Sequence, residues 1–333
     1  MKTGIMQPYF IPYIGYWQLM NAVDQYVIYD DVNFIKGGWI NRNRILVGGQ
    51  PKYFNIPMQG ASPNKQINEI GVNHDPKLRD KDLRMLEGAY KKAPFYGKVM
   101  PLMEQILASD AENLADYIAE SFGVINAYLG ITTKLIKSSS LSKDCSLKGQ
   151  DKVIAICKLL GTDEYYNAIG GQELYSFEEF RKNGMKLCFL QTDEIRYEQF
   201  GEEFQPNLSI LDVMMFNSAE QVRQMLDRYT LISEEHLTSA ENTEKDPRLT
   251  ESDLSEVMHT KKNDGTEEDR LIGENISKNT LNTMNTVDAM NNNTWNNDST
   301  HTIAHRAEIS GGGTRHAAGI ISAAFLAKGG CAA

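Results

Sequence analysis

The chain has 333 residues, of which 41% are hydrophobic and 23% charged, and its formal net charge is −10; this is the composition of a globular protein with room for one large domain or two smaller ones. Residues 1–233 carry 25 Lys and Arg against 28 Asp and Glu, so they lack the basic stripe of a nucleic-acid-binding protein. The four cysteines have no CxxC spacing, which argues against a disulfide scaffold. The first segment lacks a signal-peptide pattern, which argues against a secreted protein. No apolar run reaches the roughly 18–20 residues that a membrane span needs. We therefore expect a cytoplasmic protein.

The first thirty residues predict a strand–helix–strand unit. The apolar runs 3–6 and 25–32 are typical of strands, and "GYWQLMNAV" (15–23) between them favours a helix. Such a unit belongs to a parallel sheet with helices on its faces. We therefore predict an α/β fold with a parallel-sheet βαβ core and helical additions.

The middle of the chain adds a hairpin and three helices. "RILVGGQPKYFNIPM" (44–58) has two extended runs around a Gly-Gly pair. Residues 75–93 and 102–130 have apolar positions near a 3.6-residue repeat. The second stretch predicts two helices broken around Ser109 and Asp110, with Asp110 as an N-cap and Gly130 directly after the last helical turn.

Strands and helices then alternate again up to residue 229. Extended runs are predicted at 132–139, 164–169 and 185–192, and helices at 150–161, 177–184 and 209–229. Ser209 and Asp212 have the spacing of a capping box at the start of the last helical pair.

The composition changes near Ile232. All fifteen tyrosines and eleven of the twelve phenylalanines come before it, and Asn, Thr, Ser and acidic residues dominate afterwards. Such a segment buries too little apolar surface to offset the entropy of ordering. We predict an α/β domain over residues 1–232 and a low-complexity, disordered tail over 233–333.

A rigid aromatic loop, "QPYFIPYIGYW" (7–17), lies between the first strand and the first helix. Ligands of parallel sheets gather at the carboxyl ends of the strands, where a helix N-terminus attracts anions. The stretch resembles the strand–loop–helix of nucleotidyltransferases and adenylate-forming ligases, with Tyr13, Ile14, Gly15 and Tyr16 at the places of their H-x-G-H motif. An aromatic plug at the sheet edge is the alternative. The residues expected to line a substrate site are Gln7, Tyr9, Tyr13, Gly15 and Tyr16.

The second strand leads into a polar loop, "YDDVNFIKGGWINRNRI" (29–45). Adjacent strand residues point to opposite faces, so we expect Asp31 to orient or deprotonate an amine and Asp30 to be structural, capping the loop that follows. Arg42 and Lys36 would hold a phosphate or carboxylate, and Trp39 would stack on a sugar or base. A solvated loop is the alternative. The assignments are Asp31, Asp30 and Lys36 as catalytic residues and Trp39, Asn41, Arg42 and Asn43 as substrate-binding residues.

A third stretch, "NAIGGQELYS" (167–176), completes the predicted site. Gly170 and Gly171 allow close backbone approach or positive φ, and Tyr175 would fold over the ligand; a turn explains the glycines equally well. Residues 1–233 hold a single histidine, His74, and neither a P-loop nor a G-x-G-x-x-G motif, which argues against histidine-assisted nucleophilic catalysis and against classical nucleotide folds. We assign no metal-ligating residues.

These motifs together resemble a known family. "MQPYFIPYIGYWQLMNAVDQYVIYDDVNFIKGGWINRNRI" (6–45), with "NAIGGQELY" and "FQPNLSILD" downstream, is closely similar to the WbqC-like family over about residues 1–230. The resemblance implies a protein encoded among genes for O-antigen and other bacterial surface polysaccharides, in a family suggested to include amino-acid (glycine) transferases.

With the site chemistry, the resemblance implies a transferase of O-antigen and lipopolysaccharide biosynthesis that places an amino acid such as glycine, or an acyl group, on an amino sugar. One alternative is a metal-dependent nucleotide-sugar or glycosyl transferase; another is a non-catalytic protein that binds a sugar intermediate. The cofactor stays open, with ATP and Mg²⁺ as the candidate. The expected partners are a small-molecule sugar intermediate, an amino-acid or acyl donor and other enzymes of the pathway, with no nucleic acid.

Overall fold

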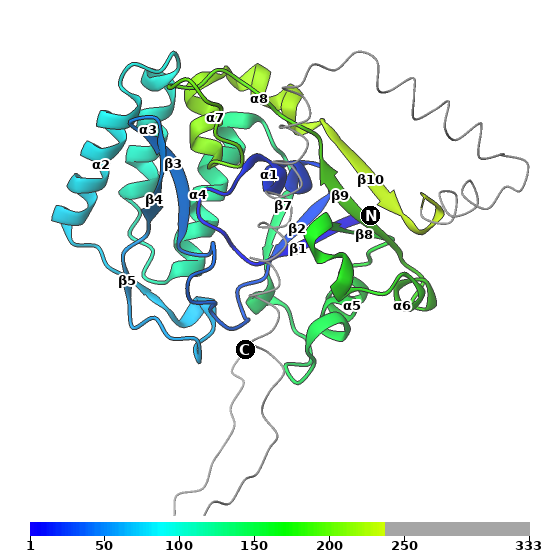
Figure 1. Ribbon diagram of the computed structural model, residues 1–333. Helices are drawn as coiled ribbons and strands as arrows, with labels where there is room; N and C mark the ends of the chain where they lie inside the picture. Colours follow the sequence, from blue (N-terminus) through cyan, green and yellow to red (C-terminus); the bar gives the residue numbers. More distant parts are fainter. Residues whose placement is uncertain (237–333) are drawn as a thin grey trace, which may run out of the picture. The chain divides into compact units, whose positions relative to one another are not determined.

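A six-stranded sheet forms the centre of the computed structural model, which describes residues 1–236 (Figure 1). Its strands are β1 (Lys2–Met6), β2 (Gln25–Ile28), β7 (Lys134–Lys137), β8 (Glu164–Ala168), β9 (Lys186–Thr192) and β10 (Tyr229–Ser233), in the order β10-β9-β8-β1-β2-β7. All neighbours pair in parallel except β9 and β10, which are antiparallel. The predicted βαβ unit is confirmed, because β1 and β2 pair in parallel around helix α1 (Ile14–Asn21).

The central strands are buried on both faces, so the apolar residues in their middle follow one another without alternation, as in "YVI" of β2 and "LCFL" of β9. Side chains alternate along each strand: Phe189 packs into a hydrophobic cluster on one face, and Leu190 packs into the cluster on the other. Helices α5 (Gly149–Leu159) and α6 (Phe177–Lys182) cover the first face, whereas α1, α7 (Ile210–Phe216) and α8 (Ala219–Leu226) belong to the second. The predicted α/β class is therefore correct, as a mostly parallel sheet between two helical layers.

The helical additions form one long insertion between the adjacent strands β2 and β7 (Figure 1). It contains the hairpin β3–β4 (Arg42–Val47 and Gln50–Asn55), the short strands β5 (Met58–Gln59) and β6 (Gly71–Val72), and the helices α2 (Pro76–Tyr90), α3 (Tyr96–Leu107) and α4 (Leu114–Leu129). The predicted hairpin turn is confirmed: Gly48 and Gly49 have φ of +62° and +75°, the conformation that tight two-residue hairpin turns require.

Two local predictions are wrong. The N-cap of α4 is Asn113, whose side chain accepts a hydrogen bond from the Asp116 amide, whereas Asp110 lies in the preceding link. The last predicted helix ends at Leu226, and the chain turns back as the antiparallel edge strand β10. The predicted end of α4 at Gly130 is confirmed, because Gly130 has φ of +73°, in the left-handed region.

The predicted domain boundary at Ile232 falls inside β10, where Ser233 is buried. The rest of the predicted tail, from residue 237 on, lies outside the described residues. Among residues 1–236, no helix has both the length and the apolar character needed to cross a membrane.

Candidate active site

The carboxyl ends of the five parallel strands meet at one edge of the sheet, and the predicted site residues follow directly from these ends. The chain runs from β1 to β2 and β7 on one side, and then crosses to β8 and β9 on the other side of β1. The strand order thus reverses between β1 and β8, and ligands of open α/β sheets bind at such a point. Residues 7–13 follow β1 and residues 169–175 follow β8, so both predicted loops flank it.

The aromatic loop 7–13 is held by hydrogen bonds from segments far away in the sequence. The Phe10 amide donates to the Ile40 carbonyl (3.0 Å), and the buried Asn43 side chain donates to the Phe10 carbonyl (3.2 Å). Ser209 donates to the Ile11 carbonyl (2.6 Å), and the Ile210 amide donates to the Pro12 carbonyl (2.9 Å).

These bonds hold an unusual backbone. Ile11 has φ of +35°, a value that a β-branched residue adopts only under strain. Strain of this kind persists only where the surroundings fix the backbone, and it concentrates at functional sites. The rigidity that the sequence predicted for this loop therefore comes from its contacts with the 30–43 loop and with the start of α7.

The tyrosines of the loop differ in their surroundings. Tyr16 is buried and donates to the Gln7 carbonyl (2.8 Å), so it belongs to the core and does not face a ligand. Tyr9 and Tyr13 are half-buried; burial raises the pKa of Tyr9 to about 12 and also raises the pKa of Tyr13. Both phenols stay protonated at neutral pH and can donate hydrogen bonds.

Gly15 is needed for packing inside the protein. A methyl group at this position would lie 2.4 Å from Thr192 Oγ1 and 2.5 Å from the Tyr13 ring. The glycine therefore lets α1 approach the end of β9, and the space above it is filled by Tyr13 and Thr192. The expectation that Gly15 packs against a ligand is not met in this conformation.

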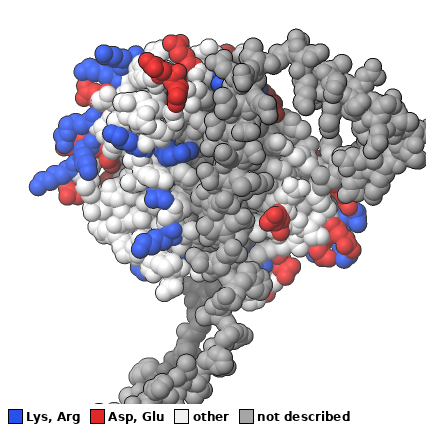
Figure 2. All heavy atoms as spheres, viewed as in Figure 1, with Lys and Arg blue, Asp and Glu red and all other residues white. Residues whose placement is uncertain are grey.

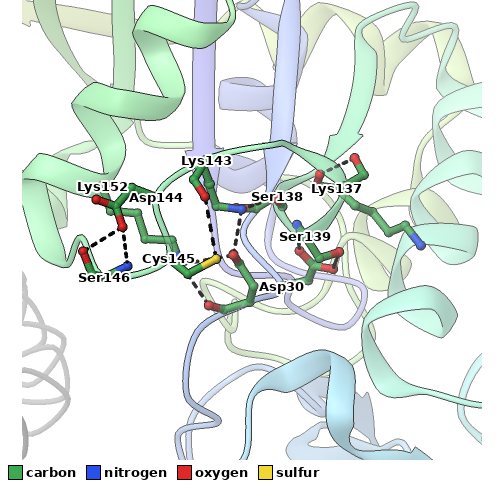
Figure 3. Close-up of polar contacts among 11 residues, drawn as sticks. Asp30, Lys137, Ser138, Ser139, Lys143, Asp144, Cys145, Ser146 and Lys152 are labelled. Carbon is green, nitrogen blue, oxygen red and sulfur yellow. Dashed lines mark hydrogen bonds and ion pairs between the residues drawn. The ribbon is translucent and has the colours of Figure 1, made fainter. Parts of the chain in front are cut away.

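Asp30 holds the segment that follows β7. It is buried and accepts hydrogen bonds from the Ser139 amide (2.8 Å) and the Ser139 hydroxyl (2.6 Å), as Figure 3 shows. The predicted structural role fits these contacts, but the predicted partner was wrong. Asp30 joins the ends of β2 and β7 and does not cap the 33–38 loop.

Asp31 lies beside two lysines that the sequence prediction missed. Its Oδ2 is 2.8 Å from Lys143 Nζ and 3.2 Å from Lys152 Nζ, and the two lysine side chains are only 4% and 9% exposed. Lys152 also donates to the Asp31 carbonyl (3.0 Å) and lies over the Tyr29 ring. Figure 3 shows both lysines reaching this cluster from the segments after β7.

The second oxygen of Asp31 has no such partner. Asp31 Oδ1 and Ser138 Oγ are both buried, and neither makes a hydrogen bond of good geometry with any residue in 1–236. Burial alone would raise the pKa of Asp31, but Lys143, the neighbouring Ser138 hydroxyl and Lys152 together hold it below its ordinary value. The group is thus a carboxylate at neutral pH, with Oδ2 bound to two lysines and the Ser138 hydroxyl as a further neighbour.

The other predicted residues of the loop 30–43 differ in their exposure and contacts. Lys36 is exposed. Among the described residues, Asp31 is neutralised by Lys143 and Lys152, so the catalytic assignment of Lys36 gains no support. Asn43 is structural, because its side chain binds the aromatic loop. Asn41 is half-buried, and its carbonyl accepts from the Ile56 amide.

Trp39 and Arg42 lie at the base of the hairpin β3–β4. Arg42 Nε donates to the Gly38 carbonyl (3.0 Å), and its guanidinium lies over the ring of Tyr53, 4.4 Å from the ring centre. Trp39 is half-buried, with its ring centre 6.2 Å from that of Tyr53.

The Gly-Gly stretch after β8 forms a short 3₁₀ segment, Ile169–Leu174. Of the two predicted reasons for the glycines, positive φ does not apply to either of them, whereas close approach applies to Gly171, where a methyl group would lie 3.1 Å from Asn167 Oδ1. Tyr175 packs on Tyr165 and on Phe180, as a lining of the core under this loop.

The prediction for Asp212, a buried carboxylate away from this edge of the sheet, was also wrong. Asp212 does not complete a capping box with Ser209. Its side chain accepts hydrogen bonds from Tyr90, Tyr197 and Gln199, each 2.8 Å long, and ties α7 to α2 and to the 193–208 loop. No group of three or more His, Cys, Asp or Glu side chains that could hold a metal ion occurs within residues 1–236.

Comparison with known proteins supplies the family. The sequence model of the WbqC-like protein family matches residues 7–224, which include all of the loops described above. The chain belongs to the WbqC-like family. It is 26% identical over 222 residues to a Mycobacterium tuberculosis protein named uncharacterized protein Rv1507c, a match that covers 66% of this chain and 95% of the relative. No solved structure matches this WbqC-like protein, so the resemblance to nucleotidyltransferases and adenylate-forming ligases has no support from a structural neighbour.

Proposed function

We propose that this WbqC-like protein is a transferase that forms an amide on an amino sugar, with an amino acid such as glycine or another acyl group as the donated part. Bacterial surface-polysaccharide biosynthesis is the setting that the family resemblance suggests. The observation that carries the chemistry is the Asp31 carboxylate, held charged by Lys143 and Lys152 at the carboxyl edge of the sheet.

Asp31 is suited to orient an amine. Its carboxylate is kept charged by Lys143 and Lys152 through Oδ2, while Oδ1 and the Ser138 hydroxyl lack partners of good geometry. An N–H group of the sugar amine would satisfy Oδ1, and fixing the attacking nitrogen in this way removes much of the entropic cost of the reaction. Because its pKa is lowered, Asp31 is a weak base, so its role is positioning more than deprotonation.

The reaction then needs an activated acyl group. The amine nitrogen attacks the acyl carbon and a C–N bond forms; the bond from that carbon to its phosphate or other leaving oxygen breaks, and the oxygen departs with the electron pair. The proton lost from nitrogen passes to the leaving group or to water. Tyr9 and Tyr13, protonated at neutral pH, are the hydrogen-bond donors of this edge that can meet the developing negative charge.

The test is a search for the amide itself. Purified protein is incubated with glucosamine or its phosphate, glycine and ATP, with and without Mg²⁺, and with an acyl phosphate in place of glycine and ATP; the product is identified by mass. Ser138→Ala should lower kcat/KM for the amine by about tenfold, the usual worth of one hydrogen bond to a charged group. The matched control is Ser142→Ala in the same segment, because Ser142 is exposed.

Two outcomes would contradict the proposal. Metal-dependent breakdown of a nucleotide sugar without amide formation would indicate a glycosyl or nucleotidyl transferase. Stabilisation by sugars in a thermal-shift assay, with no turnover under any condition, would indicate a binding protein.

A further inference from the structure

Two arginines and two aromatic rings form one surface at the hairpin β3–β4, here called the arginine–aromatic face. Its members are Arg42, Arg44 and Tyr53 on the two strands and Trp39 just before β3. The Arg42 guanidinium lies 4.4 Å from the centre of the Tyr53 ring, and the Arg44 guanidinium lies 5.7 Å from the centre of the Trp39 ring. The two rings are 6.2 Å apart, and Arg44 pairs directly with Tyr53 across the two strands.

The cations of this face have no carboxylate partner. Within residues 1–236, neither Arg42 nor Arg44 forms an ion pair, so no carboxylate competes with a ligand for either guanidinium. Arg44 Nε is buried without a hydrogen-bond partner, and the one bond of this guanidinium, to the Asn207 carbonyl, is 3.4 Å long. The exposed end of the Arg44 guanidinium, held only by this long bond, can turn its N–H groups to an anion.

The rings of the face are open to a ligand. Tyr53 is 49% exposed, an unusual position for a large aromatic side chain, and Trp39 is half-buried. In Figure 2, Lys and Arg side chains lie over the part of the visible face that carries α2 and the hairpin. Guanidinium groups bind phosphate through parallel hydrogen bonds, and aromatic rings stack on the flat faces of sugars or bases.

We propose that the arginine–aromatic face binds a phosphorylated sugar, with the phosphate on Arg44 and the sugar ring against Trp39 and Tyr53. This names the substrate class of the proposed function, on which it rests: the amino-sugar acceptor is bound as its phosphate. The near neutrality of residues 1–233, with 25 Lys and Arg against 28 Asp and Glu, favours a small anion over a long nucleic acid.

The face is also joined to the sheet edge. The backbone of Trp39 and Ile40 accepts the Phe10 amide of the aromatic loop, and Ser209, which holds the same loop, donates its amide to the Arg44 carbonyl (2.9 Å). A ligand bound to Trp39 and Arg44 therefore contacts the neighbours of both segments that hold the loop after β1 in place.

The test measures binding without turnover, by calorimetry on the full chain. The probes are glucosamine 1-phosphate, free glucosamine, inorganic phosphate and UDP-glucosamine, which separates a free sugar phosphate from a nucleotide-linked one. Glucosamine 1-phosphate or UDP-glucosamine should bind at least tenfold more tightly than either glucosamine or phosphate alone. Arg44→Lys, which keeps the charge but loses the paired hydrogen bonds, and Tyr53→Ala should each weaken this binding about tenfold. Arg84→Gln, an exposed arginine of α2, is the matched control and should change nothing.

Three results would overturn the inference: phosphate alone binding as tightly as the sugar phosphate, unchanged affinity in Arg44→Lys and Tyr53→Ala, or preferential binding of an oligonucleotide through the same residues. The proposed function can fail separately. Tight binding of the sugar phosphate with no amide product would support this face and reject the transferase chemistry, whereas amide formation unaffected by both variants would do the reverse.

Discussion

Replacing Asp31 by Asn isolates the charge that holds two buried lysines. The substitution keeps the size of the side chain and removes the only carboxylate in contact with Lys143 and Lys152 among residues 1–236. The two lysine side chains are 4% and 9% exposed, so water cannot replace the lost partner without rearrangement.

The magnitude follows from this burial. Removing one partner of a buried ion pair typically costs about 3–5 kcal/mol, and we expect about 3 kcal/mol here, because the Asn amide oxygen can still accept one hydrogen bond. For a domain of this size, 1 kcal/mol corresponds to a shift of about 2–4 °C, so the melting temperature should fall by roughly 6–12 °C. The assay is thermal and urea unfolding at pH 7, with Asp80→Asn on the exposed side of α2 as the control.

The pH dependence gives a second check. The folded pKa of Asp31 lies below its ordinary value. A depressed carboxyl pKa contributes stability above the unfolded pKa, and that contribution is lost as the pH falls through the folded pKa. The difference between wild type and Asp31→Asn should therefore be constant above about pH 5 and shrink in strong acid. A loss no larger than that of Asp80→Asn at neutral pH would refute the reasoning, since it would mean that the lysines do not depend on this charge.

Three other substitutions have expected outcomes. Asp30→Asn should cost about 1–2 kcal/mol, less than Asp31→Asn, because one of the two Ser139 hydrogen bonds survives; urea unfolding that ranks the two variants the other way would contradict this. Burial raises the pKa of Asp82 to about 6, so its charged form weakens the fold at pH values above the pKa of the unfolded chain. Asp82→Asn should therefore stabilise the protein by about 1–2 kcal/mol at pH 7.5 and have no effect near pH 4. Unfolding measured at the two pH values checks the sign. Tyr90→Phe should cost about 2–4 kcal/mol, because the phenol accepts from the Leu46 amide and donates to Asp212; a loss as small as that of Tyr96→Phe would show that water replaces both bonds.

The parts of the fold that were predictable from the sequence have local causes. The βαβ unit, the Gly48–Gly49 hairpin and the end of α4 at Gly130 each follow from a short apolar pattern or from a glycine in a position that needs positive φ. Strand β10 could not be predicted in this way. The sequence predicted a helix up to Tyr229 and no strand after it, whereas residues 229–233 pair with the edge of β9.

The candidate site was predictable as a place but not as a set of contacts. The end of β2 points to Asp30 and Asp31, yet their partners Ser139, Lys143 and Lys152 lie more than one hundred residues further along the chain. One signal was present: Lys152 is a charged residue among the apolar positions of α5, and a buried lysine requires a carboxylate. Arg44 gave no such signal, because its unpartnered Nε depends on how loop 193–208 packs on the hairpin.

The last prediction concerns what holds the aromatic loop in its strained conformation. Ser209 is buried; its hydroxyl accepts from the Leu211 amide as the N-cap of α7 and donates to the Ile11 carbonyl at 2.6 Å. Ser209→Ala should lose both, about 1 kcal/mol for the cap and about 1–3 kcal/mol for the buried carbonyl left without a donor. The control is Ser218→Ala, which removes the N-cap of α8 and no contact to the loop, and should cost about 1 kcal/mol.

Measured by urea unfolding, the difference between these two serine variants is the contribution of the bond to Ile11, where φ is +35°. If Ser209→Ala is the more costly and also weakens sugar-phosphate binding, the loop after β1 is held for the ligand at the expense of local strain. Equal losses in the two variants would show that the loop keeps its shape without Ser209, and the strain at Ile11 would then have to be maintained by Asn43 and by the backbone of Trp39 and Ile40.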